Sequence, residues 1–167
     1  MKNSSSIRRT NLSGSLYRLI YRSCHVIPPS TPDQDGEHAI RTILATARRR
    51  NKADGITGAL LFTASGFAQV LEGPRDALER TFERISADPR HTDVMVLSFT
   101  PTERRCFPDW SMGFCAHTAP LSADPLAPLQ AAAPLDTAFD PPRATTGTEM
   151  LRLLEKVVQR DDVWVAA

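Results

Sequence analysis

The chain has 167 residues, a formal net charge of +1, and acidic and basic residues interspersed along its length. This length suits one domain with tails and allows a sizeable core. The balanced charge gives no sign of a nucleic-acid-binding or membrane-binding surface, and no apolar run approaches the ~20 residues that span a bilayer. Three cysteines without CxxC or zinc-ligand spacing indicate reduced thiols in a cytoplasmic protein, and no metal site is expected.

The first part of the chain predicts a tail, a strand and a helix. Residues 1–15 are polar and lack the apolar stretch of a signal peptide, so we expect them to be a disordered N-terminal tail. Residues 16–23 alternate, with Tyr17 and Tyr21 on one face and arginines on the other, which predicts a strand whose arginine-bearing face is the wetter one. A proline-rich loop follows, and residues 37–51 have the apolar spacing of a helix.

The middle of the chain predicts four more strands and a second helix. The segments with strand character are "GALLFT", "FAQVLE", "TDVMVLSF" and "FPDWSMGFC", and a tight hairpin at "ASG" joins the first two. Gly73–Pro74 opens the helix, because proline is well placed in a first turn, and Pro89 closes it. In the last strand, Trp110, Met112 and Phe114 are expected to share one face.

The resulting order, β-α-β-β-α-β-β, indicates an α+β fold of the ferredoxin-like kind. In this sandwich two helices cover one face of a mixed, mostly antiparallel sheet. Residues 116–146 are rich in proline and alanine and predict a linker with little persistent core. A last amphipathic helix, near residues 148–160, would be unstable alone and must pack on the exposed sheet face or on a partner. We therefore expect a core domain at 16–115 and a C-terminal helix with its tail at 147–167.

Several polar side chains fall on faces that should be apolar. Tyr21 and Gln69 lie among apolar residues of their strands, and Asn51 continues the apolar stripe of the first helix. Arg84 and Asp88 border the stripe of the second helix. Taken singly, such residues are more often satisfied core groups than functional ones. Together they indicate a polar-lined slot between the two helices, which suits a flat ligand with amide-like edges.

Five stretches, "LIYRS", "NKADGITGALLF", "GFAQVLEG", "DPRH" and "RCFPDWSMGF", resemble the BLUF domain, a blue-light sensor that uses a flavin. The resemblance covers about residues 16–114, with the stretches in the expected order and spacing, and the fold of that family is the one inferred above. It implies that Tyr21 is the photoactive tyrosine and Gln69 the switching glutamine. It also implies that Asn51 holds the pyrimidine edge of the flavin.

The resemblance further implies that Trp110 and Met112 take part in signalling. Arg84 and Asp88 match positions that contact the carbonyl and imide region of the ring in some members, and His91 in "DPRH" is a further candidate contact. The flavin would be held without a covalent bond, as FAD, FMN or riboflavin.

In such a domain the excited flavin would take an electron and a proton from Tyr21, and the Gln69 amide would be left rotated or tautomerised. A different hydrogen bond to the ring would then shift the flavin spectrum to the red. Ala47 stands where many members carry a serine, which implies an altered lifetime of the lit state. Because we expect no catalytic domain in this chain, output would pass to a separate effector protein or to a change in self-association, such as a homo-oligomer.

Three other functions fit parts of the pattern. A flavin-free, ferredoxin-like protein-interaction module would keep the fold without the chromophore. An acylphosphatase-like hydrolase would need a glycine-rich phosphate cradle after the first strand, and "RSCHVIPPS" does not supply one. An RNA-recognition module would need surface aromatics on its central strands and a basic face. The combination of Tyr21, Gln69 and Asn51 favours the flavin-binding sensor over all three.

Overall fold

The computed structural model describes residues 15–26, 35–117, 123–127 and 142–158. Most of the expected N-terminal tail, proline-rich loop, linker and C-terminal tail lies outside the described residues. The elements in chain order are β1 (Leu16–His25), α1 (Asp35–Asp54), β2 (Thr57–Thr63), β3 (Phe67–Pro74), α2 (Arg75–Ser86), β4 (His91–Pro101), β5 (Gly113–His117) and α4 (Pro142–Val158).

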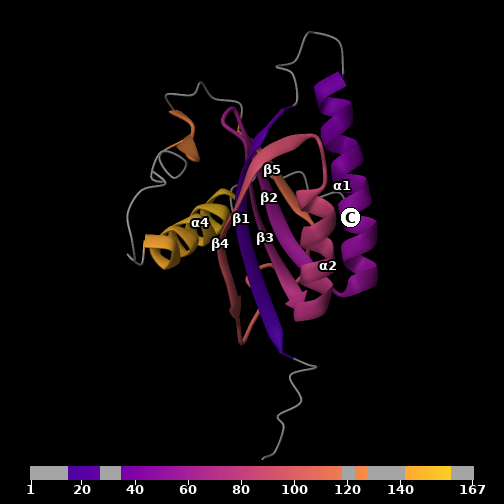
Figure 1. Ribbon diagram of the computed structural model, residues 1–167, viewed down its shortest axis with the longest axis vertical. Helices are drawn as coiled ribbons and strands as arrows, with labels where there is room; N and C mark the ends of the chain where they lie inside the picture. Colours follow the sequence, from indigo (N-terminus) through magenta and orange to yellow (C-terminus); the bar gives the residue numbers. More distant parts are fainter. Residues whose placement is uncertain (1–14, 27–34, 118–122, 128–141, 159–167) are drawn as a thin grey trace, which may run out of the picture.

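The described strands form one five-stranded sheet in the order β4-β1-β3-β2-β5. Neighbouring strands are antiparallel except β2 and β5, which are parallel. Helices α1 and α2 cover one face of this sheet and α4 covers the other (Figure 1). We call these the helix face and the α4 face. The expected ferredoxin-like α+β fold, with two helices on one face of a mixed sheet, is confirmed.

Each face of the sheet has its own apolar core, because successive strand residues point to opposite faces. The core of the helix face includes Leu19, Leu44, Leu60, Phe67, Leu71, Leu78 and Phe114. The core of the α4 face includes Ile20, Leu61, Val70, Leu97, Leu126, Met150 and Leu154. The central strands β1, β3 and β2 are therefore largely buried on both faces, whereas the edge strand β4 is mostly exposed or half-buried.

The end of α1 and the start of α2 lie at residues that favour helix boundaries. Helix α1 extends beyond the predicted residues 37–51 at both ends, and Gly55 directly after it has φ of 66°, the left-handed conformation that commonly follows a helix. Helix α2 begins directly after Pro74, whose φ is −59°. No helix in the described ranges is long and apolar enough to cross a membrane.

The arginine-bearing face of β1 is not the wetter one, so that prediction is wrong. Arg22 is only 6% exposed, and the Arg18 side chain is 16% exposed. The reason is α4, which packs on this face through the fully buried Met150 and Leu154. The alternation within one strand separates its two faces, but it cannot reveal that a distant helix covers the second face.

The last strand is shorter than predicted. Strand β5 begins only at Gly113, and residues 107–112 lie outside any strand, mostly in turns and bends. Met112 joins the core of the helix face while Trp110 packs in the core of the α4 face, so the expectation that they share one face is wrong. A Pro-Asp pair at residues 108–109 favours a turn there, and a turn breaks the period-2 pattern.

The segment after β5 also differs from the expectation of little persistent core. Leu126 is fully buried in the core of the α4 face. Asp124 accepts hydrogen bonds from the backbone N–H groups of Ser65 and Leu126, both at 2.8 Å. Residues 123–127 are thereby joined to the β2–β3 hairpin.

Candidate functional site

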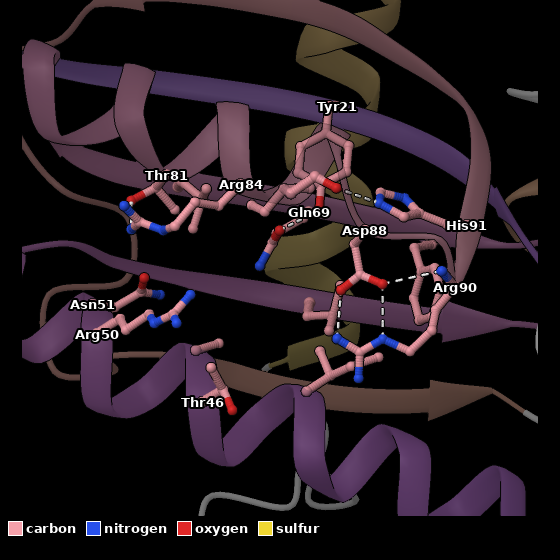
Figure 2. Close-up of a pocket in the computed structure, with 16 residues that line it drawn as sticks. Tyr21, Thr46, Arg50, Asn51, Gln69, Thr81, Arg84, Asp88, Arg90 and His91 are labelled. Carbon is pink, nitrogen blue, oxygen red and sulfur yellow. Dashed lines mark hydrogen bonds and ion pairs between the residues drawn. The ribbon is translucent and has the colours of Figure 1, made fainter.

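A pocket lies on the helix face between α1 and α2, above the central strands β1 and β3 (Figure 2). It brings together six of the eight predicted site residues: Tyr21, Asn51, Gln69, Arg84, Asp88 and His91. Its apolar walls include Ile43, Leu60, Leu71 and Ile85. The predicted slot between the two helices is therefore present. Met112 and Trp110 are not among its lining residues.

At the base of the pocket, Tyr21 and Gln69 face each other across β1 and β3. Each is 4% exposed. The Tyr21 hydroxyl donates a short hydrogen bond to Oε1 of Gln69. Burial, together with the nearby negative charge of Asp88, raises the pKa of Tyr21 well above its usual value. Tyr21 therefore keeps its proton at ordinary pH and holds the Gln69 amide in a defined orientation.

The other end of the Gln69 amide contacts Met112. Nε2 of Gln69 donates to Sδ of Met112 at 3.2 Å, and both side chains are buried. A thioether sulfur is a weak acceptor, so this amide group can exchange it for a stronger partner. Met112 thus lies in contact with the Tyr21–Gln69 pair although it is outside the pocket lining.

Asn51 occupies the last turns of α1 and is 2% exposed. Its Nδ2 donates to the backbone carbonyl of Ser111 at 2.8 Å. One turn earlier, Nε of Arg48 donates to the carbonyl of Met112 at 3.1 Å. Helix α1 therefore both lines the pocket and fixes the chain just before β5.

The end of α2 supplies the charged side of the pocket. Asp88 accepts hydrogen bonds from the backbone and side chain of Arg90, including Nε at 2.8 Å, and this partner holds the pKa of Asp88 below its usual range. Arg84 donates from Nη2 to Thr81 Oγ1 at 2.8 Å and lies 3.4 Å from Asp54 Oδ2 at the end of α1. The Asp88 carboxylate and the Arg84 guanidinium thus have separate partners.

Four polar residues of the pocket were not predicted from the sequence: Thr46, Arg50, Thr81 and Arg90. Arg90 had a detectable signal, because it follows Asp88 by two residues around a proline and such a turn brings the two side chains together. Thr46 and Arg50 gave no signal of this kind, because polar residues at such helical positions are ordinary. Thr81 lies three residues after Leu78 on the buried stripe of α2, so its spacing could have identified it.

His91 forms part of the pocket wall at the start of β4. Its Nδ1 lies 2.8 Å from Ser23 Oγ, and its Nε2 lies 2.7 Å from the carbonyl of Ile85. Because a carbonyl only accepts hydrogen bonds, Nε2 carries the proton. His91 therefore connects β4 to β1 and to α2 while facing the pocket.

Trp110 lies apart from the pocket, on the α4 face. Its ring stacks on Phe107, with centroids 6.0 Å apart and planes at 29°. A side chain at Gly113 would approach its ring to 2.8 Å, so the absence of one leaves room for the indole. Of the two residues predicted to signal, Met112 contacts the Tyr21–Gln69 pair and Trp110 packs on the opposite face of the sheet.

Comparison with known proteins points to one family. The family model described as BLUF, sensors of blue-light using FAD, matches residues 16–113. Photoactivated adenylate cyclase subunit beta of Euglena longa is 42% identical over 74 residues, which are 44% of this chain and 9% of the relative. The blue light- and temperature-regulated antirepressor BluF of Escherichia coli K12 is 36% identical over 91 residues, 53% of this chain and 21% of the relative. The match thus spans at most about a fifth of either relative.

Solved structures agree with this result. BlrB, a BLUF protein in its dark state, is 38% identical, with a TM-score of 0.56 over 62% of this chain and 74% of that chain. The ground state of BlsA is 25% identical, with a TM-score of 0.65 over 88% of this chain and 90% of that chain. The second comparison extends over nearly the whole of both chains.

Proposed function

The chain belongs to the BLUF family of flavin-binding blue-light sensors, and we propose that it works as a light-operated hydrogen-bond switch built on Tyr21 and Gln69. The observation that carries the proposal is the buried hydrogen bond from the Tyr21 hydroxyl to Gln69 Oε1 at the base of a pocket between α1 and α2. A phenol and a primary amide buried together in this way can exchange donors and acceptors without any covalent change.

The lining of the pocket fits the isoalloxazine ring of a flavin. Its walls are apolar side chains from α1, α2 and the sheet, which suit a flat aromatic system. Its polar groups include the amides of Asn51 and Gln69, which offer both donors and acceptors to a ring edge that alternates them. Asn51, Gln69 and Arg84 would hold the ring, with Asp88 and His91 at the pocket wall. When bound, the flavin supplies the absorption of blue light and an excited state that is a strong oxidant.

Within the protein, the switch consists of two amide contacts that cannot change independently. In the resting arrangement Gln69 accepts from Tyr21 and donates to Met112. If the amide reverses, its NH₂ group meets the Tyr21 oxygen and its carbonyl oxygen meets the Met112 sulfur, which has no proton to donate. The contact to Met112 is then lost. A change of one hydrogen bond is worth about 0.5–1.5 kcal/mol, enough to bias a segment that is held in balance.

The output of the switch is a second part of the proposal. We propose that this chain acts as a sensor rather than as an enzyme, and that it signals to a separate effector protein or through self-association. The relatives named above support regulation of this general kind, since one is a photoactivated cyclase subunit and another a blue-light-regulated antirepressor. FAD or FMN is the expected flavin; the family description names FAD, and a structure of Klebsiella pneumoniae BlrP1 is described with FMN.

An absorption spectrum of the purified protein, recorded in darkness and again after blue light, tests this function. We expect a flavin band that shifts slightly to the red and returns in the dark, and mass spectrometry of the extracted chromophore identifies the flavin. A protein that takes up no flavin even after reconstitution would contradict the proposal and favour the flavin-free interaction module.

A further inference from the structure

A carboxylate that the switch does not use is completely buried on the α4 face. Glu72 of β3 is 0% exposed. Its Oε1 accepts from Nε of Arg18 at 2.7 Å and from the backbone N–H of Cys106 at 3.0 Å. Its Oε2 accepts from the N–H groups of Cys106 at 2.8 Å and Phe107 at 3.0 Å. Both carboxylate oxygens thus bind backbone groups of the segment that connects β4 to β5.

Two arginines complete this arrangement, which we call the Glu72 anchor and define as Glu72, Arg18, Arg105 and the backbone of residues 104–107. Arg18 donates to the carbonyl of Arg104 at 3.0 Å in addition to its ion pair with Glu72. Arg105 donates to the carbonyl of Gly55 at 2.7 Å and also to the carbonyl of Glu72. A buried carboxylate is costly unless it is fully satisfied, and here the backbone groups that satisfy it, beside Arg18, belong to one short segment.

The far end of the same segment reaches the switch. The N–H of Gly58 donates to the carbonyl of Trp110 at 3.0 Å, and α1 binds the next two carbonyls as described above. Met112 then contacts Gln69. Gln69 and Glu72 are on opposite faces of β3, so one strand holds both ends of residues 104–112.

The ring of Trp110 connects the two ends. It stacks on Phe107, whose N–H is bound by Glu72, and two residues later the chain reaches Met112. If the anchor released Cys106 and Phe107, their N–H groups would be left without a buried acceptor, and the segment would have to move to find another. Such a movement would change the packing of Trp110 and the distance from Met112 to Gln69.

We propose that Glu72 is a positioning residue for the switch, which fixes residues 104–112 so that Met112 meets Gln69 and Trp110 stays packed on the α4 face. This role rests on the proposed function, because it concerns the same hydrogen-bond switch. Glu72 does not touch the pocket; it acts through the backbone that it binds.

The substitution Glu72→Gln tests this role with little change of shape. A glutamine amide has one oxygen and one NH₂ group, so the NH₂ group replaces one of the two carboxylate oxygens and faces that oxygen's donors. In place of Oε1 it faces Arg18 and the N–H of Cys106, and in place of Oε2 it faces the N–H groups of Cys106 and Phe107. The exposed Glu83→Gln on α2 is the matched control. Both are made with Trp164→Phe, so that Trp110 is the single tryptophan.

Three measurements are made on each variant: flavin content, the rate of return from the red-shifted state, and the emission of Trp110 with its quenching by acrylamide. For Glu72→Gln we expect unchanged flavin content. The return from the red-shifted state should be about tenfold faster, which is the fold-change that corresponds to the loss of one charge-assisted hydrogen bond. The emission of Trp110 should shift to longer wavelength and be quenched more strongly by acrylamide. The control should match the parent protein in all three. A less stable Glu72→Gln protein with unchanged return rate and Trp110 emission would overturn the proposal, because the anchor would then be merely structural.

If Glu72→Gln does not fold, Arg18→Lys decides the question in the same way. It keeps the charge but cannot donate to both Glu72 and the carbonyl of Arg104 in the present geometry. The same faster return and emission shift would support the proposal, and their absence would overturn it. Should the parent protein show no light response at all, the proposed function fails, and Trp110 emission alone still tests whether Glu72 positions the segment.

Discussion

Strands β1 and β3 bring together two polar cross-strand pairs, one on each face of the sheet. On the helix face, Tyr21 pairs with Gln69 at the base of a pocket. On the α4 face, Arg18 pairs with Glu72, and backbone groups of residues 104–107 surround the carboxylate. The first pair lies where two helices leave space for a ligand, whereas the second is enclosed by the chain itself. A buried polar pair therefore indicates a ligand site only where the neighbouring elements leave room.

This comparison assigns different work to the two faces. The α4 face binds the connection between β4 and β5, and α4 covers it. Its side chains should therefore contribute mainly to stability and to the position of that connection. The helix face surrounds the pocket, so its polar side chains should contribute mainly to flavin binding and to the light response. Variants on each face test whether the two faces differ in this way.

The largest effect is expected for Leu154→Ala on α4. Leu154 is fully buried in the core of the α4 face, so its truncation should lower the free energy of unfolding by about 2–5 kcal/mol. Because the pocket lies on the opposite face, flavin content should be retained at temperatures where the variant is folded. Urea unfolding measures the free energy of unfolding, and absorbance measures the flavin content. The control is Leu153→Ala, at a half-buried position, which should lower the free energy of unfolding by less. Loss of flavin without loss of stability would contradict the division.

A smaller effect is expected from alkaline pH, through Tyr21. Its folded-state pKa is raised, so the folded protein keeps a proton that the unfolded chain releases near pH 10. The stabilisation is complete below pH 10 and declines as pH rises above it, by about 1.4 kcal/mol between pH 9 and 11. Tyr21→Phe should lack this part of the decline and Tyr17→Phe should retain it. Urea unfolding at pH 9 and pH 11 measures this decline in the free energy of unfolding. An equal decline in the two variants would show that Tyr21 ionises as readily in the folded protein as in the unfolded chain.

The smallest effect is expected for Asn51→Ala. This variant removes the pocket amide and the hydrogen bond to Ser111, so flavin should bind up to about tenfold more weakly, as expected for one lost hydrogen bond. Exposed Lys52→Ala, the next residue on α1, is the matched control and should bind flavin as the parent does. Titration of the apoprotein with FMN measures both affinities. Equal affinity in the two variants would exclude Asn51 as a ring contact.

Much of the helix face could be predicted from the sequence. Strand alternation placed Tyr21 and Gln69 on the buried side, and helical spacing placed Asn51 on the inner stripe of α1; the structure brings these residues to one pocket. Such predictions succeed because a residue's face depends on its neighbours along the same element. The roles of these residues in a photocycle stay predictions.

The α4 face could not be predicted in the same way. The core of this face includes Met150 and Leu154 of α4, a helix that begins more than a hundred residues after β1. The positions of Trp110 and Met112 depend on turns stabilised by Glu72 and α1, and a local pattern carries no information about such distant partners. Glu72 itself looked like an ordinary polar end of a strand, because its partners come from other elements.

The light-minus-dark absorption spectrum of Tyr21→Phe tests whether the Tyr21–Gln69 hydrogen bond is the switch. Tyr17→Phe is the control, because Tyr17 also lies on the helix face of β1 but packs on Phe99, outside the pocket lining. We expect Tyr21→Phe to bind flavin as the parent does but to give no red-shifted state, and Tyr17→Phe to give the normal shift. A normal, reversible red shift in flavin-loaded Tyr21→Phe would contradict the role of the Tyr21–Gln69 hydrogen bond as the switch.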